Sequence, residues 1–428
     1  MLDINLIRQN PEIVRKDLEK RNDLEKIKLL EEVIELDKQW RKEISELNNL
    51  RRERNEISEN IAKLKKEGKD VSDLLEKAKE LPKKIKELEE KVEAKENRIR
   101  EILMTLPNIL HESVPIGKDE NDNVVIKTWG EIPKFSFKPK DHQDLGLSLD
   151  LMDIERAAKV AGARFYYLKN ALVELNWALI KYGLDFIKKR GFKLFQPPYM
   201  IRREALEGAI AFQDFQDMIY KIEEENLYLI GTAEHALLAY HMNEIFDVKD
   251  LPLLYAGISP CFRKEAGTHG KDTKGIFRVH QFEKVEQFIF CKPEESWHWF
   301  EVLIKNAEEF FQSLGIPYRV VNICSGDIGS IAAKKYDIEA WLPGQGKYRE
   351  VVSCSNCTDY QARRANIRFR EGNEIKFVHT LNSTLVATER AIIAIMENYQ
   401  QEDGSILIPE VLRPYLNGAE KITKKGLE

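Results

Sequence analysis

Two segments near the middle of the chain carry charged side chains in a pattern that could bind oxyanions. Arg263 and Glu265 stand two residues apart, and Arg278, Phe282 and Glu286 follow at intervals of four. Both segments have strand character, and residues at even spacing on a strand share one face. Arginine suits phosphate and carboxylate oxygens because its planar guanidinium donates two hydrogen bonds at once and remains charged. We therefore expect cations and carboxylates to cluster on one face of a sheet.

The stretch between these two segments predicts the tip of a β-hairpin. This tip would contain the residues Thr268, His269, Gly270 and Lys271. An exposed hairpin with ion pairs between its strands would carry the same types of residue. On this segment alone, a binding site and a surface hairpin are equal alternatives.

The familiar nucleotide-binding and hydrolase motifs are absent from the sequence. It contains no G-x-x-x-x-G-K-[ST] phosphate loop and no G-x-G-x-x-G segment after a strand. It also lacks the metalloprotease helix and the G-x-S-x-G elbow. If the chain binds ATP, it must do so with a different arrangement of residues.

The cysteines argue against both a disulfide framework and a zinc site. There are five of them in a chain of 428 residues, and an odd number in a large chain favours a reducing compartment. Cys354 and Cys357 form a C-x-x-C pair that could supply half of a zinc site. No second pair of ligands with suitable spacing follows, so we expect two buried thiols and no zinc.

The first hundred residues predict a long helical hairpin. Gly68 is the only glycine before residue 106, and apolar residues recur at helical spacing on both sides of it. The second half keeps the 4-3 spacing of a coiled-coil seam, with Lys95 in one apolar place. Residues 67–70 supply the turn, and about 40 residues per helix give an arm of roughly 60 Å. Pro82 either kinks the second helix or marks its true start.

The charges of this hairpin leave its role open. Residues 26–104 contain 21 Lys and Arg against 20 Asp and Glu, and the whole chain has a formal net charge of −5. A salt-bridged coiled coil that only dimerises explains this balance, because charge runs are usually solvated faces. The clusters Arg51-Arg52-Arg54 and Lys63-Lys65-Lys66 could instead contact phosphates.

The rest of the chain has a mixed pattern. Residues 107–123 have the composition of a linker. Helices are predicted at 163–189, 294–313 and 389–399, and a strand at 278–290, without regular βαβ units. This grouping predicts an α+β fold with a mainly antiparallel sheet flanked by helices. We place the helical hairpin at residues 1–106 and the second domain at residues 107–428.

Three segments, in the expected order, resemble the motifs of class II aminoacyl-tRNA synthetases. Residues 191–200 resemble motif 1, which forms the dimer interface in that class. The hairpin at 262–286 resembles motif 2, and residues 381–390 resemble motif 3. This motif 3 lacks the glycines that many members carry, and it matches the seryl branch of archaea and eukaryotes.

Further segments are similar to the seryl-tRNA synthetase family in particular. Residues 231–234 resemble its serine-binding T-x-E loop, and residues 161–168, 334–341 and 350–364 resemble its signatures. The resemblance covers essentially the whole chain, including the hairpin. It implies an enzyme that activates serine with ATP and transfers it to the 3′ end of tRNA(Ser), with tRNA(Sec) left open as a second acceptor.

Proteins of the rival classes lack part of this sequence pattern or would not need it. Threonyl, prolyl and glycyl enzymes share the general motifs but not this hairpin, and ligases that charge a carrier protein dispense with the arm. A relative that only binds RNA or partner proteins would not need the charged residues of the motifs. A coiled-coil scaffold with a nucleotide-binding domain is the least specific alternative.

The resemblance also implies roles for single residues. The expected catalytic residues are Arg263, Glu350 and Arg390, with Mg²⁺ held on ATP by Glu350 and Ser353. The residues expected to bind ATP are Arg263, Lys264, Glu265, Val279, Glu350, Val351, Val352, Ser353 and Arg390. The residues expected to bind serine are Thr232, Ala233, Glu234, Arg263, Glu286, Asn382 and Thr384.

The resemblance further implies a homodimer whose ligands are ATP, L-serine, Mg²⁺ and tRNA. The N-terminus has no basic segment followed by an apolar core. No apolar run approaches the roughly 18 residues of a membrane-spanning helix. We therefore expect no membrane association and a cytoplasmic location.

Overall fold

The structure is a computed structural model that describes residues 1–266, 272 and 274–428. Its chain divides into two compact units, Met1–Pro107 and Asn108–Glu428. The predicted hairpin tip at Thr268, His269, Gly270 and Lys271 lies outside the described residues. Within them, no helix combines the length and the apolar character needed to cross a membrane.

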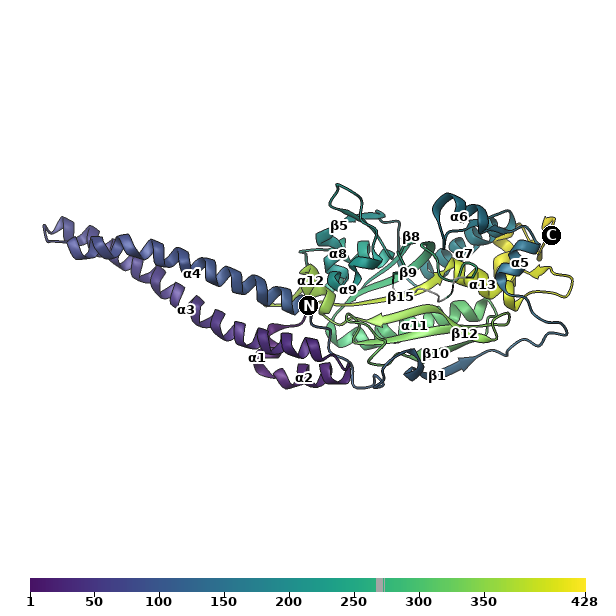
Figure 1. The fold of residues 1–428 in the computed structure, drawn as a ribbon, viewed down its shortest axis with the longest axis horizontal. Helices are drawn as coiled ribbons and strands as arrows, with labels where there is room; N and C mark the ends of the chain where they lie inside the picture. The colour runs from purple at the N-terminus through teal and green to yellow at the C-terminus, as the bar shows by residue number, and fades with distance from the viewer. Residues whose placement is uncertain (267–271, 273) are drawn as a thin grey trace. The chain divides into compact units, whose positions relative to one another are not determined.

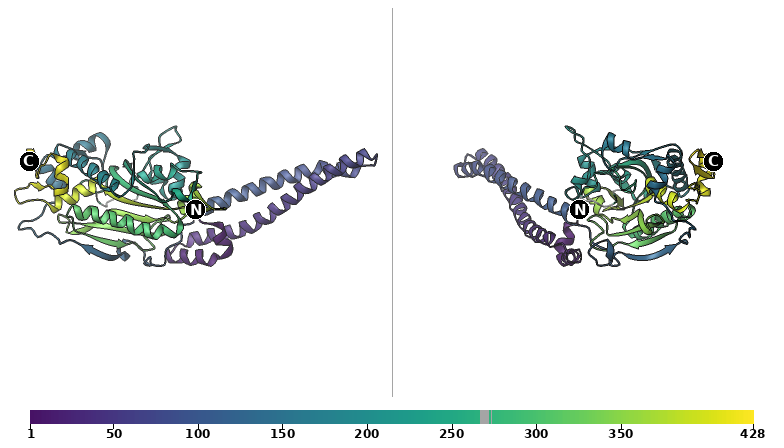
Figure 2. Two further views of the ribbon diagram at one scale, coloured as in Figure 1. Left: turned by 180° about the vertical axis from the view of Figure 1, so that it is seen from behind. Right: turned by 45° about the vertical axis from the view of Figure 1, so that its right-hand side comes forward.

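The first unit is helical, and two long helices dominate it (Figures 1 and 2). Its helices are α1 (Ile4–Gln9), α2 (Pro11–Lys20), α3 (Leu24–Lys66) and α4 (Ser72–Thr105). α3 has 43 residues, which span about 65 Å at the usual helical rise. α3 and α4 pack along each other, so the predicted coiled-coil hairpin is confirmed. The two short helices before it were not predicted.

A narrow apolar seam joins the two long helices. Leu47, Ile85 and Val92 are buried in it. Lys95 occupies a heptad position that is usually apolar. Its ammonium forms an ion pair across the seam with Glu43 at 2.9 Å, and both side chains are about one-fifth exposed. The long apolar stem of the lysine can fill the seam while its charge is neutralised at the edge.

The turn of the hairpin relies on one glycine. Gly68 has a φ of +68°, a conformation that favours glycine. α4 begins at Ser72 and continues through Pro82. The alternative in which Pro82 marks the start of the second helix is therefore wrong.

The second unit is built on an eight-stranded sheet in the part that the structure describes. In spatial order its strands are β1 (Val124–Trp129), β10 (Tyr318–Asn322), β11 (Lys334–Leu342), β12 (Lys347–Asn356), β15 (His379–Ala387), β9 (Gln281–Cys291), β8 (Leu253–Phe262) and β4 (Lys193–Phe195). Every neighbouring pair is antiparallel except β4 and β8. The predicted α+β fold with a mainly antiparallel sheet is confirmed.

Both faces of this sheet are covered by helices, as its central strands show. On β9, Val285, Ile289 and Cys291 belong to one apolar core, and Phe288 and Phe290 belong to another. Because side chains alternate along a strand, the two cores lie on opposite faces of the sheet. A strand buried on both faces reads as a nearly continuous apolar run, and the C-terminal end of β9, residues 288–291, has that sequence.

Different helices supply the two cores (Figure 1). The larger core contains residues of α7 (Ala171–Lys188), α11 (Ser296–Ser313) and α13 (Thr388–Asn398). The smaller core contains residues of α8 (Arg203–Ala209), α10 (Ala233–Ala239) and α12 (Tyr360–Ala365). The smaller core covers only part of its face and leaves room beside it for a cavity.

Two predicted boundaries are wrong at their N-terminal ends. The helix predicted at 163–189 begins only at Ala171. Arg164 and Asn170 adopt positive φ values of 63° and 50°, and a right-handed helix cannot contain such residues. The strand predicted from residue 278 begins at Gln281, because the residues before it form a turn that lines the cavity.

Candidate active site

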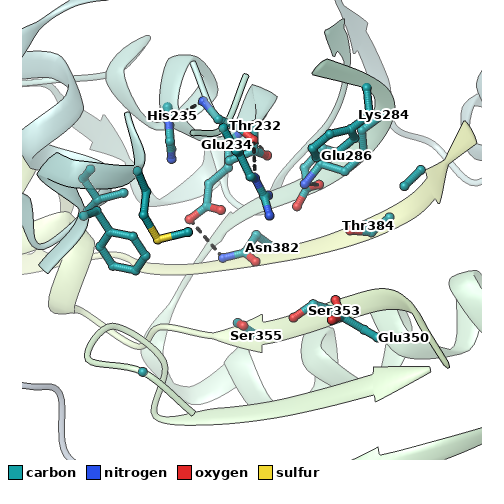
Figure 3. A pocket seen from close by; sticks show the side chains of 18 of the residues that line it. Thr232, Glu234, His235, Lys284, Glu286, Glu350, Ser353, Ser355, Asn382 and Thr384 are labelled. Carbon is teal, nitrogen blue, oxygen red and sulfur yellow. Dashed lines mark hydrogen bonds and ion pairs between the residues drawn. The ribbon is translucent and has the colours of Figure 1, made fainter. Parts of the chain in front are cut away.

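A cavity of about 420 Å³ lies on the face of the sheet that carries the smaller core. Phe282, Lys284 and Glu286 line it, and their even spacing places them on the same face of β9 as Phe288 and Phe290. Side chains from β12, β15 and the start of α10 complete the lining (Figure 3). Segments far apart in the sequence therefore meet in one polar pocket.

One end of the cavity is acidic. Thr232 caps α10 and accepts a hydrogen bond from the backbone N–H of Glu234 at 3.3 Å. The carboxylate of Glu234 accepts hydrogen bonds from Gln361 at 2.7 Å and from Asn382 at 3.2 Å. Burial, reinforced by the charge of Glu286, raises the pKa of Glu234 to about 7. Thr384 pairs with Glu286 across the strands, so these predicted residues do lie together.

A lysine that sequence reasoning missed holds the second carboxylate of this end. Lys284 forms an ion pair with Glu286, and both side chains are almost completely buried. Burial raises the pKa of Glu286, while the charges of Lys284 and Arg263 oppose that rise. The even spacing from Phe282 through Glu286 along a strand is the signal that could have identified this residue.

Arg263 lies between the two ends of the cavity and is held by a backbone carbonyl. Its Nε donates to the carbonyl oxygen of Gly231 at 3.2 Å. The N–H of Gly231 in turn donates to Nδ1 of His235 at 3.3 Å. Burial and the charges of Arg263 and Lys284 lower the pKa of His235 to about 3, so its ring is neutral and can accept this bond. His235 was also missed, and nothing in the sequence pattern reveals this contact.

The other end of the cavity combines cations with carboxylates. Arg390 donates to the backbone oxygen of Glu350 at 2.8 Å and lies 3.4 Å from its carboxylate. Burial alone would raise the pKa of Glu350, but the charges of Arg390, Lys335 and Arg263 hold it below its ordinary value. Glu350 therefore stays ionised.

The oxygens beside Glu350 fit a hard divalent cation. Ser353 lies opposite Asp337 in the register of β12 and β11, and burial raises the pKa of Asp337 to about 7. One carboxylate oxygen of Asp337 is buried without a hydrogen-bond partner among the described residues. Magnesium is commonly held by one or two carboxylates together with the phosphates of a substrate, so this donor set suits it.

The segment that resembles motif 2 contributes a paired arginine and carboxylate at the side of the cavity. Arg278 lies 2.9 Å from Glu265 and 3.4 Å from Asp272. Glu265, which has a φ of +51°, lines the cavity together with Val279. The ion pairs expected of a surface hairpin are therefore present, yet Arg278 and Glu265 also line the pocket.

Three predicted site residues have side chains that lie outside the cavity. Ala233 packs below Gly257 of β8, and Val352 belongs to the core on the other face of the sheet. The ammonium of Lys264 lies over the ring of Tyr220, 5.7 Å from its centroid. Only backbone atoms of these three residues could contact a ligand there.

The paired cysteines are structural neighbours of the cavity. Cys354 and Cys357 are both buried and carry free thiols. Asn382 donates to the sulfur of Cys357 at 3.6 Å. In the described part of the chain, no group of three His, Cys, Asp or Glu side chains could hold a metal ion by itself.

Comparison with known proteins agrees with this geometry. The seryl-tRNA synthetase N-terminal domain matches residues 1–110, and the class II core domain of the G, H, P, S and T synthetases matches residues 219–399. A serine–tRNA ligase of Pyrococcus horikoshii is 58% identical over 97% of this chain and 96% of its own length.

Solved structures extend the likeness to the whole fold. The crystal structure of the seryl-tRNA synthetase from Pyrococcus horikoshii complexed with ATP has a TM-score of 0.95 and 57% identity, with 99% of each chain covered. The cytoplasmic serine–tRNA ligase of Naegleria fowleri in complex with AMP has a TM-score of 0.89 and 39% identity, again with 99% of each chain covered. Identity of this degree over nearly the full length shows that the chain belongs to the seryl-tRNA synthetase family.

Proposed function

We propose that the cavity of the second unit is where this serine–tRNA ligase joins serine to ATP, before serine passes to the 3′ end of tRNA(Ser). The observation that carries this proposal is the pairing of an acidic end with a cationic end inside one pocket. Serine brings an ammonium group and ATP brings phosphates, so each end suits one substrate. The relative that is 57% identical to this chain was crystallised with ATP.

The acidic end would hold serine. Glu234 and Glu286 supply anions for the ammonium group, and Thr232, Asn382 and Thr384 supply polar partners for the hydroxyl. A pocket built to hydrogen-bond a hydroxyl rejects alanine strongly, because its own buried polar groups would otherwise be left unpaired. Ala233 would contribute through its backbone alone.

The cationic end would hold the triphosphate of ATP. Attack of the serine carboxylate on the α-phosphorus needs alignment and charge neutralisation more than covalent help. Arg263 stands between the two ends and would orient both reacting groups, and Arg390 would contact the distal phosphate. Glu265 and the backbone at Val279 would hold the adenine end, with backbone contacts from Lys264, Val351 and Val352.

Glu350 and Ser353 would hold magnesium on the phosphates. The bound ion would supply positive charge that offsets the negative charge of the leaving pyrophosphate. Glu350 suits this role because neighbouring cations keep its pKa low. We place the reaction in the cytoplasm, since the buried free thiols fit a reducing compartment.

Serine-dependent exchange of labelled pyrophosphate into ATP is the first test. Among the twenty amino acids, we expect serine alone to support rapid exchange. Replacing Arg263 by Ala should lower the exchange rate by about a hundredfold or more, the usual scale for losing an electrostatic contact to the transition state. Arg156→Ala, which removes a highly exposed arginine, should leave the rate unchanged. Exchange driven by another amino acid would overturn the assignment.

The acidic end predicts a pH dependence. Serine presents a positively charged ammonium group, so Glu234 must be ionised to pair with it, and the pKa of Glu234 is about 7. As the pH falls through 7, kcat/KM for serine should drop by about tenfold per pH unit. Glu234→Gln should have low activity and no such drop.

Asp337→Asn is the matched control for this pH effect, because Asp337 also has a pKa of about 7 but lies at the cationic end. It should retain the dependence of kcat/KM for serine. A wild-type profile that stays flat from about pH 6 to 8 would contradict the role of Glu234.

The helical arm would bind the body of the tRNA rather than take part in adenylation. Lys63, Lys65 and Lys66 lie in the last turn of α3, where all three are exposed. None of them forms an ion pair within the described residues. Cations at a helix C-terminus also interact favourably with the helix dipole. That interaction does not require three unpaired lysines, so we assign them to contacts with tRNA phosphates.

Removal of the arm separates the two steps of the reaction. Deletion of residues 28–102 should spare serine-dependent exchange and severely impair charging of tRNA(Ser). A full-length variant with Lys63, Lys65 and Lys66 changed to Gln should bind tRNA more weakly and with a shallower salt dependence. The matched variant with Arg at all three positions keeps the charge and should bind normally. Equal loss of exchange and charging after the deletion would refute the role of the arm.

A homodimer is the assembly that the motif 1 segment supports. β4 is an edge strand, and its Leu194 is 43% exposed. Tyr240, which contacts Phe195 of β4, is 61% exposed. Apolar side chains exposed at a sheet edge are expected where two copies pair.

Sedimentation equilibrium tests this assembly directly. The wild type should have twice the chain mass of 49.8 kDa, and Leu194→Asp should shift it towards the single-chain mass. Ile375→Asp is a matched control, because Ile375 is also on a strand and is 44% exposed, and it should leave the mass unchanged. A wild-type protein of single-chain mass would exclude the dimer.

A further inference from the structure

A short helix that no motif marked contacts the segment leading into β9. This helix is α5 (His142–Ser148), capped by Asp141. Lys274 forms an ion pair with Asp141. The backbone N–H of Gly275 donates to the side chain of Gln143 at 2.6 Å, and that of Ile276 donates to Nε2 of His142 at 3.1 Å. Three successive residues before β9 are therefore held by three successive residues at the start of α5.

The contact at His142 fixes which ring nitrogen carries the proton. A backbone N–H can only donate, so Nε2 must accept the bond from Ile276 and the proton must be on Nδ1. Nδ1 lies 3.0 Å from a carboxylate oxygen of Glu397. The same carboxylate accepts the backbone N–H of His142 at 3.1 Å and that of Gly344 at 2.9 Å.

This anchor is buried and leaves no space for a side chain at residue 275. His142 is 3% exposed and Glu397 is fully buried. A Cβ on Gly275 would lie 1.9 Å from Nε2 of His142, and Gly275 has a φ of +68°. The backbone of the segment can therefore approach the ring only because residue 275 is a glycine.

The anchored segment forms one wall of the cavity. Ile276, Phe277, Arg278 and Val279 all line it. Two arginines lie over the ring of Phe277: the guanidinium carbon of Arg390 is 4.5 Å from the ring centroid, and that of Arg349 is 3.8 Å from it. The position of this backbone therefore sets the position of Val279, where the adenine end of ATP would bind. It also influences Arg390, the arginine expected to contact the distal phosphate.

We propose that His142 is a positioning residue for ATP, which acts by holding the backbone of Ile276 and so the wall of the cavity formed by residues 276–279. It contacts neither substrate, and Glu397 orients it. The inference rests on the proposed function, because it assigns the anchored wall to ATP rather than to serine. Serine binding, at the other end of the cavity, should not depend on His142.

Two substitutions separate the two hydrogen bonds of the ring. In His142→Gln, the new carbonyl oxygen can reach the position of Nε2 and accept from Ile276, but the side chain has no donor at the position of Nδ1. In His142→Asn, the new amide nitrogen can replace Nδ1 and donate to Glu397, but the shorter side chain has no acceptor near Ile276. His142→Gln therefore keeps the anchor, and His142→Asn keeps the partner of the buried carboxylate.

The expected result is that His142→Asn weakens ATP binding and His142→Gln does not, although each substitution lowers the Tm. His142→Asn should raise the KM for ATP in pyrophosphate exchange, and the Kd for ATP measured by calorimetry, roughly three- to tenfold, the effect of one hydrogen bond. Its KM for serine should stay close to that of the wild type, although its Tm should fall because the buried N–H of Ile276 loses its acceptor. His142→Gln should bind ATP normally and should also have a lower Tm than the wild type, because Glu397 loses a donor.

Gly275→Ala tests the same anchor from the other side. It should raise the KM for ATP at least as much as His142→Asn does, because its Cβ displaces the backbone from the ring. Gly372→Ala is the matched control, since Gly372 has a similar φ of +61° with nothing within 4 Å of an added Cβ. It should lower stability slightly and leave the KM for ATP unchanged.

The outcomes distinguish this inference from the function on which it rests. If the wild type catalyses serine-dependent exchange but the KM for ATP and the Tm change together in both His142 variants, His142 is merely structural. A larger increase in the KM for serine than in the KM for ATP in His142→Asn would also overturn the proposal. If the wild type neither exchanges pyrophosphate with serine nor binds ATP, the proposed function itself fails.

Discussion

The burial of several carboxylates in one cavity is the constraint on which the second unit depends. Glu286 and Asp337 are buried, Glu234 is partly buried, and all three lie in or beside this pocket. An ionised carboxylate away from water is costly unless a cation or several donors accompany it. The structure meets this requirement with Lys284, Lys335, Arg263 and Arg390. The result is a set of charges that is fixed before any ligand arrives, which is what electrostatic catalysis requires.

Arg263 must itself be held, and the fold does this with neutral groups. Arg263 is placed by a carbonyl oxygen, and the peptide that carries this oxygen is placed by the neutral ring of His235. A charged histidine there would repel Arg263, so the low pKa of His235 is part of the arrangement. The same logic applies at His142, where a neutral ring between Glu397 and a backbone N–H holds a wall of the cavity. Neutral imidazoles can join an acceptor to a donor without adding charge.

An antiparallel sheet makes such a set of charges possible because its register is precise. Thr384 lies opposite Glu286, and Ser353 lies opposite Asp337. These pairs are far apart in the sequence, so only strand pairing can bring them together. The larger core on the opposite face, with its fully buried side chains from α7, α11 and α13, keeps the strands from shifting. A slip of one residue would turn each pocket side chain into that core.

Sequence patterns predicted the parts of this architecture that depend on local periodicity. The heptads indicated the long arm, and the spacing of Phe282 and Glu286 placed these two side chains on one face of a strand. The helix expected from residue 163 was wrong at its start, because the positive φ values of Arg164 and Asn170 follow from tertiary contacts rather than propensity. His142 and His235 could not be found from spacing, since each acts on a backbone group that no periodic pattern reveals. The side chain of Val352 was assigned to ATP, but strand alternation and a bulge between β11 and β12 put it in the opposite core.

The arm shows why a balanced charge count is a poor guide to function. Its 21 cations and 20 anions between residues 26 and 104 nearly cancel, but they are not paired evenly along its length. Lys95, Arg98 and Arg51 pair with acids of the facing helix at 2.9, 2.7 and 2.7 Å, and these pairs hold the two helices together. Lys63, Lys65 and Lys66, near the turn, have no such partners in the described part of the chain. The cations that stabilise the coiled coil are therefore different residues from the lysines that could bind an external phosphate.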